Sequence, residues 1–365
     1  MKSAVAASAT EPIRVMVVDD SAVIRGFIVR TLEAEPEIQV VASCANGAIA
    51  LQQLPKAAPD VVILDIEMPV MDGLTALPKL LAADPGLKLV MASTLTQRNA
   101  EVSLKALTLG AADYLPKPSA ASPANARDFH HQLQEKIKVL GWLRRKQRPV
   151  VKPAVAPPPS AQVLSLRRQL AHLPPKLLVI GSSTGGPQAL TEVLRALPPA
   201  FSAPILIAQH MPPTFTTVLA QHLGRAIGRP CSEARADEPI VDGIVRVAPG
   251  GCHMEIASGE RGLKLRLSDA PPENFCRPSV NPLFRTAAKV TGAATVAVML
   301  TGMGADGLEG ARDIAGAGGT LIAQDEATSV VWGMPGAVAT AGLCNDILPL
   351  KSIAPHLVQL FGVGQ

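Results

Sequence analysis

Residues 61–73, VVILDIEMPVMDG, decide the fold of the first part of the chain. Four apolar, mostly β-branched residues lead directly into Asp65, and a turn containing Pro, Asp and Gly follows. A short apolar run that ends in a polar turn is typical of a strand buried on both faces of a parallel sheet. Further strands are predicted at Ile13–Val18, Val40–Ala42, Leu87–Ala92 and Tyr114–Leu115, with helices between them that include Ala22–Glu33 and Ala100–Leu109.

The second part of the chain repeats this alternation, beginning with LLVIGSSTGGPQAL at residues 177–190. Strands that alternate with helices form parallel sheets covered on both faces, so the predicted fold class is α/β with two doubly wound parallel-sheet domains. A β-richer insert is expected at about residues 239–268. The strands predicted here are Leu177–Ile180, Pro204–Ala208, Ala294–Leu300 and Thr320–Gln324, and in the insert Ile244–Ala248 and Leu263–Leu267.

Length and composition limit the possible classes of protein. The 365 residues are 48% hydrophobic and 18% charged, which suits two folded domains and excludes wholesale disorder. No apolar run approaches the roughly 18–20 residues of a membrane-spanning helix. Five scattered cysteines without CxxC spacing argue for a reducing compartment, and against a disulfide framework or a structural zinc site. We therefore expect a cytoplasmic protein.

A composition break separates the two parts. Residues 149–159 read PVVKPAVAPPP, and such prolines favour extended, semi-rigid chain. The segment 121–175 holds ten Lys and Arg against two Asp and Glu, a net charge of +8. Residues 1–120 and 176–365 carry −3 and −1, which disfavours a nucleic-acid-binding domain. We expect a flexible tail at 1–12 and a basic, Pro-rich linker at 146–174.

An amphipathic helix is predicted just before this linker, because Phe129, Leu133, Ile137 and Leu140 recur at three- or four-residue spacing. A basic cluster marks its end, and two interpretations are open. The cluster is either a solvated helix end, where cations suit the helix dipole, or a docking patch for an acidic partner. Its members are Arg144, Arg145, Lys146 and Arg148.

Polar side chains follow the predicted strands of the first part. Asp19 and Asp20 end the first strand, Asp65 the third, Ser93 the fourth and Lys117 the fifth. Ligands of open α/β sheets bind beyond the carboxyl ends of the strands, so these groups should converge. Carboxylates this close repel one another unless a cation lies among them, and an all-oxygen set suits Mg²⁺. Any one of these aspartates, Asp20 above all, could instead be a helix cap or turn residue.

These residues carry a resemblance. DD at 19–20, LDIEMPVMDG at 64–73 and KP at 117–118 resemble a two-component receiver domain over residues 13–145. The resemblance implies a flavodoxin-like fold, phosphorylation of Asp65 by a histidine kinase, and a bound Mg²⁺. It also implies the following roles: Asp19, Asp20, Asp65 and the Glu67 carbonyl for Mg²⁺, Ser93 and Lys117 for the phosphoryl group, and Tyr114 as the switch aromatic.

A second candidate site begins at Gly181-Ser182-Ser183-Thr184-Gly185, which fits a G-x-S-x-G nucleophile elbow with Ser183 at its centre. The same turn could instead bind an anion or a nucleotide. A nucleophilic serine needs a base and an orienting acid. The candidates are His210 and Asp306, each at the end of a predicted strand, although a lone histidine is often structural and Asp306 could cap a helix.

The second resemblance is carried by IGSSTGGP, AQHMPP, VAPGGCHM, RPSVNPLF, LTGMGADGLEG and QDEATSVVWGMPG, in this order. Together they resemble the catalytic domain of the CheB family of chemotaxis protein-glutamate methylesterases, over 175–365. The resemblance implies a Rossmann-like esterase domain without a cofactor, with Ser183 as nucleophile, His210 as base and Asp306 as orienting acid. It further implies that Thr184 lies beside the triad and that the Met303 N–H belongs to the oxyanion hole.

The resemblance implies a function, and the sequence departs from the family pattern at two positions. The expected enzyme is a phosphorylation-activated serine hydrolase that demethylates, and also deamidates, methyl-accepting chemoreceptors. It would be a monomer that neither binds nucleic acid nor inserts into a membrane. The family pattern leads us to expect an acidic residue near Asn281 and often a histidine in place of Cys276. We expect both positions in a rim segment that affects substrate preference. A phosphorylation-dependent scaffold is the alternative from another class, whereas a DNA-binding output domain is disfavoured.

Overall fold

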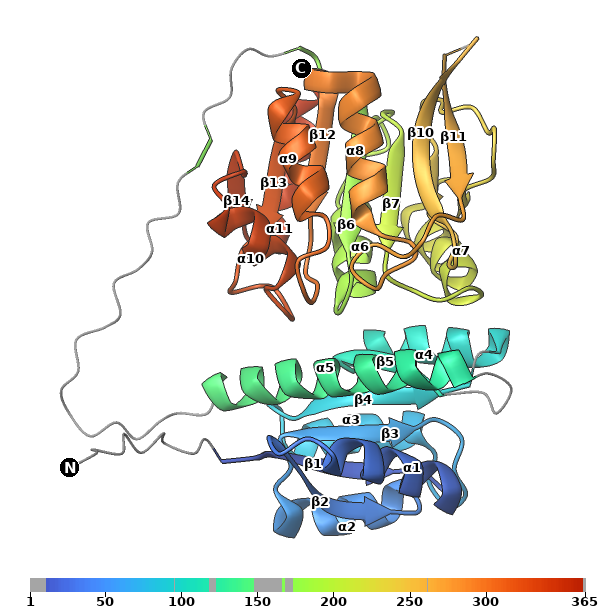
Figure 1. Ribbon diagram of the computed structural model, residues 1–365, viewed down its shortest axis with the longest axis vertical. Helices are drawn as coiled ribbons and strands as arrows, with labels where there is room; N and C mark the ends of the chain where they lie inside the picture. The colour runs from blue at the N-terminus through green and yellow to red at the C-terminus, as the bar shows by residue number, and fades with distance from the viewer. Residues whose placement is uncertain are drawn as a thin grey trace, which may run out of the picture. The chain divides into compact units, whose positions relative to one another are not determined.

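The computed structural model describes residues 11–94, 96–117, 123–147, 166–167, 173–260 and 262–363. The chain forms two compact units, one built on strands β1 to β5 and the other containing β6 to α11 (Figure 1). Most of the expected tail at 1–12 and of the expected linker at 146–174 lies outside the described residues. Pro118 of the KP motif lies outside them too.

The first unit is built on the predicted parallel sheet, with five strands in the order β2-β1-β3-β4-β5. The order reverses beside β1, so helices cover both faces: α1 contacts α5, and α2 contacts α3. The strands are β1 (Ile13–Val18), β2 (Ile38–Cys44), β3 (Val61–Asp65), β4 (Lys88–Ser93) and β5 (Asp113–Pro116). The helices are α1 (Ala22–Glu33), α2 (Gly47–Ala57), α3 (Gly73–Ala83), α4 (Gln97–Thr108) and α5 (Pro123–Gln147).

The turn after β3 accounts for the residues that end the stretch 61–73. All five residues of β3 are buried, as expected for a central strand of a parallel sheet. The chain then folds back so tightly that a Cβ on Gly73 would lie 2.0 Å from the Asp65 carbonyl oxygen. Asp72 caps α3 by accepting a hydrogen bond of 2.7 Å from the Thr75 N–H. The turn therefore requires glycine and holds Asp65 at the end of β3.

The helix predicted before the linker is confirmed as α5, because all four of its spaced apolar residues are buried. In its basic cluster, Arg144 and Arg145 differ from both interpretations offered by the sequence, Lys146 is exposed, and Arg148 lies outside the described residues. Arg144 binds Asp84 through two oxygens, at 2.7 and 2.8 Å, and Arg145 binds the buried Asp60 at 3.0 Å. These two arginines fasten α5 to its own unit, so they are neither a solvated helix end nor an open docking patch.

The second unit contains a parallel sheet of seven strands in the order β14-β13-β12-β6-β7-β9-β8. Its strands are β6 (Leu177–Ser182), β7 (Ile205–Gln209), β8 (Cys231–Glu233), β9 (Val245–Val247), β12 (Thr295–Met299), β13 (Thr320–Gln324) and β14 (Asp346–Leu348). Its α-helices are α6 (Gly186–Arg195), α7 (Phe215–Ile227), α8 (Val280–Thr291), α9 (Leu308–Gly316), α10 (Met334–Thr340) and α11 (Leu350–Leu360).

The β-richer insert is smaller than predicted. The strand expected at Ile244–Ala248 is β9, which pairs with β7 and so belongs to the main sheet. A separate antiparallel hairpin remains, formed by β10 (His253–Gly259) and β11 (Gly262–Ser268). The error arose because a short apolar strand looks the same in sequence whether it lies at the edge of a central sheet or in a hairpin.

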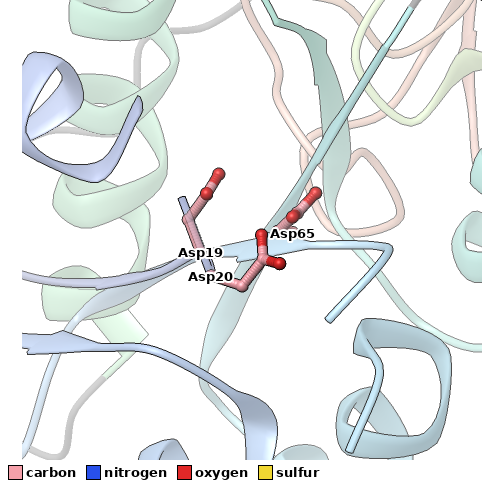
Figure 2. A group of neighbouring side chains, drawn as sticks. All are labelled: Asp19, Asp20 and Asp65. Carbon is pink, nitrogen blue, oxygen red and sulfur yellow. The ribbon is translucent and has the colours of Figure 1, made fainter. Parts of the chain in front are cut away.

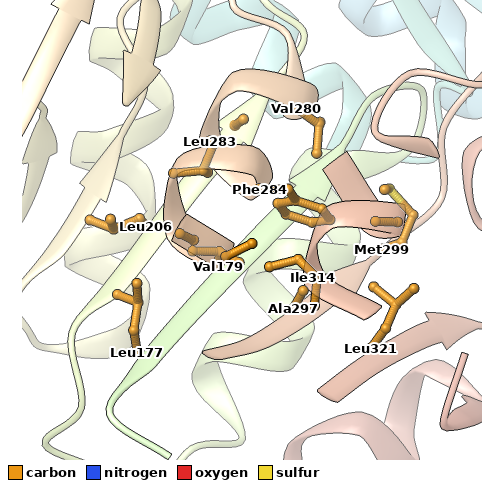
Figure 3. Close-up of a cluster of buried hydrophobic side chains, with 14 of the residues drawn as sticks. Leu177, Val179, Leu206, Val280, Leu283, Phe284, Ala297, Met299, Ile314 and Leu321 are labelled. Atoms are coloured by element: carbon orange, nitrogen blue, oxygen red, sulfur yellow. The ribbon is translucent and has the colours of Figure 1, made fainter. Parts of the chain in front are cut away.

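The core of the second unit lies between α8 and the sheet. Phe284 of α8 is fully buried among Val179 of β6 and Ala297 and Met299 of β12 (Figure 3). Leu283 and Ala287 are also buried in this cluster. This packing fixes the start of α8 beside the carboxyl ends of β6 and β12, where the second candidate site lies.

Phe284→Ala should destabilise the second unit by about 3–5 kcal/mol, because it removes a buried ring and leaves a cavity. Chemical unfolding of the whole chain would measure the change in unfolding free energy. The matched control is Val241→Ala, since Val241 is half exposed and its truncation should change stability by less than about 0.5 kcal/mol. Equal losses for the two variants would contradict this account of the core.

Candidate functional site

Three carboxylates gather where β1 and β3 end (Figure 2). Asp19, Asp20 and Asp65 each offer an oxygen, and these oxygens all lie within 4.8 Å of one another. Asp19 and Asp65 are buried, whereas Asp20 is exposed. β1 and β3 are neighbours at the point where the strand order reverses, which is why residues 45 positions apart meet here.

Lys117 lies among these carboxylates, directly after β5. Its Nζ is 2.7 Å from Asp19 Oδ2 and 2.7 Å from Asp65 Oδ1. Burial raises the pKa of Asp65, and the ammonium of Lys117 opposes that shift. The Ile66 N–H donates to Asp65 Oδ1 at 2.8 Å and helps to hold the carboxyl group. One cation cannot balance three close carboxylates, so an oxygen-rich site of this kind fits a divalent cation such as Mg²⁺.

The other expected members of this site are placed as follows. Ser93 is the last residue of β4 and is buried at the same edge of the sheet. Tyr114 is buried in β5, and burial raises its pKa well above the usual value. Glu67 is exposed in the turn after β3, and the contact of its carbonyl with a metal remains a prediction.

Asp20→Asn should weaken divalent-cation binding at this cluster, because it removes one charged oxygen from the set while leaving the buried pair intact. Isothermal titration of Mg²⁺ into the full chain would measure the loss of affinity. Glu33→Gln is the matched control, because it removes an exposed carboxylate at the far end of α1. Equal affinities for Asp20→Asn and the unaltered chain would exclude Asp20 as a ligand.

Ser183 follows β6 on a turn that matches the predicted elbow. Its N–H donates to the Thr301 carbonyl at 3.0 Å, and its own carbonyl accepts from the Gly186 N–H and from Gln209 Nε2, at 2.8 and 2.9 Å. Gly185 adopts φ +76° at the start of α6, a conformation that favours glycine. The turn therefore fixes the backbone on both sides of Ser183, and its hydroxyl has no hydrogen-bond partner among the described residues.

His210 and Asp306 are brought together as predicted. His210 follows β7, and its N–H donates to the Ser182 carbonyl at 3.1 Å, which keeps it beside the end of β6. His210 Nε2 lies 2.7 Å from Asp306 Oδ2. Asp306 is buried in the loop between β12 and α9, and Gly307 rather than Asp306 occupies the cap position of that helix. The three residues therefore come from the ends of three adjacent strands: β12, β6 and β7.

Asp306 receives hydrogen bonds that the sequence interpretation missed. Ser279 Oγ donates to its Oδ1 at 2.6 Å, the Val280 N–H to its Oδ2 at 2.7 Å, and Asn274 Nδ2 to its Oδ1 at 3.0 Å. Ser279 also caps α8. The motif RPSVNPLF contained the signal, because a serine before an apolar helical pattern is typical of a cap that presents free N–H groups.

Thr184 and Gly302, the neighbour of Met303 in the chain, lie close to Ser183 in the structure. The Thr184 side chain is buried and its carbonyl accepts from Thr301 Oγ1 at 2.9 Å. A Cβ on Gly302 would lie 3.0 Å from Ser183 Cβ, so the chain passes directly beside the serine just before Met303. This close approach requires glycine at 302. The assignment of the Met303 N–H to an oxyanion hole stays a prediction.

The two positions that depart from the family pattern, Asn281 and Cys276, do not lie in a rim segment as predicted. Asn281 is buried rather than on a rim, and its Oδ1 accepts from the Gly310 N–H at 2.9 Å, which ties α8 to α9. Cys276 Sγ lies 3.4 Å from His210 Nδ1. Cys276 therefore touches the candidate base itself. The sequence could not show this, because the segment before α8 has no regular structure that would indicate where its side chains point.

The charges around His210 favour its protonated form. Burial alone lowers the pKa of His210, but the Cys276 sulfur and the Asp306 carboxylate outweigh it and raise the pKa to about 10. Burial also opposes the charged form of Asp306, yet the hydrogen bonds from His210 and Ser279 lower its pKa to about 2. These contacts stabilise the imidazolium, the form that a general base reaches after taking a proton.

Two family comparisons agree with this geometry. Residues 178–357 match the CheB methylesterase family, and residues 15–126 match the response regulator receiver domain. A protein-glutamate methylesterase/protein-glutamine glutaminase of Rhodopseudomonas palustris is 51% identical over 96% of this chain and 95% of its own length. The chain belongs to the CheB methylesterase family.

Further comparisons agree with this family membership. A protein-glutamate methylesterase/protein-glutamine glutaminase of Paramagnetospirillum magneticum is 52% identical over 96% of the chain and 97% of its own length. The CheB methylesterase catalytic domain of Thermotoga maritima is 39% identical, with a TM-score of 0.50, and covers 52% of this chain and all of that one. Within the described part of the CheB chain, no helix is both long and apolar enough to cross a bilayer.

Removing the sulfur of Cys276 should lower the pKa of His210, because the sulfur is one of the groups that raise it. A titration of the His210 ring by nuclear magnetic resonance would place the midpoint for the unaltered chain above the usual 6.5 and for Cys276→Ala at a lower pH. Cys252→Ala is the control and should leave the midpoint in place. An unchanged midpoint in Cys276→Ala would contradict the coupling.

Proposed function

We propose that this CheB-family protein hydrolyses γ-methyl esters of glutamate on methyl-accepting chemoreceptors and deamidates receptor glutamines. The observation that carries the proposal is the His210–Asp306 pair, 2.7 Å apart, beside a serine elbow on the adjacent strand. Both reactions replace a leaving group at the same acyl carbon, methanol in one and ammonia in the other, so one site serves both.

The mechanism follows from what each residue can do. With His210 neutral, its Nδ1 takes the Ser183 proton while Ser183 Oγ attacks the ester carbonyl. The imidazolium then gives this proton to the departing methoxide, and methanol leaves. Water, deprotonated by the same ring, attacks the acyl-serine. The ring returns this proton to Ser183 Oγ as the bond between Ser183 and the acyl group breaks, and the glutamate carboxylic acid is released and ionises. Asp306 holds the ring through Nε2 throughout and stabilises its positive charge.

The oxyanion of each tetrahedral intermediate needs N–H donors. Two stretches of backbone next to Ser183 are the proposed sources: the turn that leads into α6, and the backbone after Gly302, including Met303. Removing one such donor typically slows a serine hydrolase by about 10²–10³. Thr184, beside the serine, would help to orient this backbone.

The receiver supplies the control. A histidine kinase would phosphorylate Asp65, with Mg²⁺ held by Asp19, Asp20, Asp65 and the Glu67 carbonyl, and Ser93 and Lys117 would contact the phosphoryl oxygens. Phosphorylation adds about −1.5 to −2 charges at a site where Lys117 now joins Asp65 to Asp19, so these contacts must rearrange. Tyr114, in the strand before Lys117, would report that change as the switch residue.

The cellular setting follows from this assignment. The proposed substrates are receptor domains exposed to the cytoplasm, so we propose that the enzyme is cytoplasmic. We further propose that it acts as a monomer and needs neither nucleic acid nor insertion into a membrane. The second domain needs no cofactor for this acyl chemistry, because serine, histidine and aspartate supply the nucleophile, base and acid. We propose domain limits of 13–145 for the receiver, 146–174 for the linker and 175–365 for the esterase.

Ser183→Ala should abolish release of labelled methanol from methylated receptor membranes, with a loss of at least about 10⁴-fold. A small phosphodonor with Mg²⁺ should raise release by the unaltered protein, and Asp65→Asn should remove this increase but keep the basal rate. Ser202→Ala, at an exposed serine of the same unit, is the matched control.

Two outcomes would contradict the proposal. Release that persists in Ser183→Ala would exclude this serine as the nucleophile. Phosphodonor-dependent binding of receptors without methanol release by any variant would favour a scaffold whose second domain is catalytically idle.

A further inference from the structure

A tight turn holds Cys276 against the candidate base. The Glu273 N–H donates to the Cys276 carbonyl at 3.2 Å, and the Cys276 N–H returns a bond of 2.9 Å to the Glu273 carbonyl. Asn274 and Phe275, the two residues between them, adopt positive φ values of 51° and 61°. A two-residue turn of this kind leaves its ends little freedom, because both backbone pairs are made.

Two side-chain contacts fasten this turn to the catalytic elements. Arg285 of α8 binds the Glu273 carboxylate through two nitrogens, at 3.1 and 2.9 Å. Asn274 donates to Asp306 at 3.0 Å. The turn is therefore anchored both to the helix that frames the site and to the acid of the triad, so the place of the Cys276 sulfur is built into the site.

The Cys276 sulfur contacts the ring nitrogen of His210 that the proposed mechanism needs. His210 has two ring nitrogens: Nε2 is bound to Asp306 at 2.7 Å, and Nδ1 lies 3.4 Å from Cys276 Sγ. In the proposed mechanism Nδ1 takes the proton of Ser183. The thiol and the serine hydroxyl therefore compete for one nitrogen, and Cys276, His210 and Asp306 form a Cys-His-Asp array in which a thiol has a base and the base has an orienting acid.

We propose that Cys276 is a modification site for hydroperoxides, and that its oxidation withdraws His210 from Ser183 and stops the esterase. The half-buried position of Cys276 leaves the sulfur accessible to a small oxidant. The loss of activity rests on the proposed function, whereas the modification itself does not.

The chemical step balances as follows. His210 Nδ1 takes the thiol proton, and the sulfur attacks one oxygen of the peroxide. The O–O bond breaks, and the departing hydroxide takes the proton from the imidazolium to form water. Cys–SH and H₂O₂ thus become Cys–SOH and H₂O, with sulfur oxidised by two electrons and peroxide reduced by two. The new S–O–H group can donate to Nδ1, where it excludes the serine.

The other cysteines lack this arrangement. Cys44 and Cys344 are buried, and burial raises the pKa of Cys231 to about 12. Cys252 is half-buried like Cys276, but its Sγ donates to Asp269 Oδ1 at 3.3 Å. Burial and this carboxylate raise the pKa of Cys252. Cys252 therefore has a carboxylate beside it instead of an imidazole. Cys252 is therefore the matched control.

The test treats the full chain with limiting hydrogen peroxide in the presence of a cyclic 1,3-diketone, which captures sulfenic acids, and maps the adducts by peptide mass spectrometry. Cys276 should be labelled at least about tenfold faster than Cys252. His210→Gln should slow the labelling of Cys276 without changing that of Cys252. Equal labelling of the two cysteines, or labelling of Cys276 that does not depend on His210, would overturn the proposal.

Activity provides a second readout, taken as the ratio of methanol release after and before peroxide. This ratio should fall for the unaltered protein and for Cys252→Ser, and should recover with dithiothreitol. It should stay near one for Cys276→Ala and Cys276→Ser. If peroxide lowered the activity of the Cys276 variants to the same extent, oxidation of Cys276 would not be what withdraws His210 from Ser183. If the protein releases no methanol at all, the proposed function fails, but the labelling result still decides whether Cys276 is modified.

Discussion

The second unit depends on keeping one carboxylate, Asp306, ionised in a buried place. Such a charge is costly unless every acceptor position is used, and here His210, Ser279, Asn274 and the Val280 N–H all donate to it. These donors come from the end of β7, from the turn before α8 and from α8 itself. The same bonds that make burial tolerable also bring the parts of the site together, so folding of this region and assembly of the catalytic groups are one event.

The first unit solves a related problem in a different way. Asp19 and Asp65 are also buried carboxylates at strand ends, but their charge partner is the Lys117 ammonium instead of a ring held on both sides. A lysine on a flexible stem can leave one carboxylate for another acceptor at low cost. The Asp306 site has a fixed geometry, whereas the phosphorylation proposed at Asp65 would change the charge of that site and rearrange its contacts.

The sequence predicted the features that depend on local patterns. Alternating strands and helices gave the α/β class, and the spacing from Phe129 to Leu140 gave α5. Strand ends located Asp65, His210 and Asp306, because parallel strands deliver their last residues to one edge. What escaped prediction depends on long-range contacts without a period. The pairing of β9 with β7 and the approach of Cys276 to His210 are set by packing between segments far apart in the chain.

Position 276 holds a cysteine where the resemblance to the family leads us to expect a histidine in many members. A histidine there would place a second imidazole near His210, able to accept or donate a hydrogen bond but not to be oxidised by peroxide in the same way. A cysteine keeps a small polar contact at Nδ1 and adds a reactive sulfur. The turn from Glu273 to Cys276 is anchored by bonds from Arg285 to Glu273 and from Asn274 to Asp306, which restrain the position of residue 276. A change of residue on this turn therefore changes the chemistry next to the base rather than the shape of a distant rim.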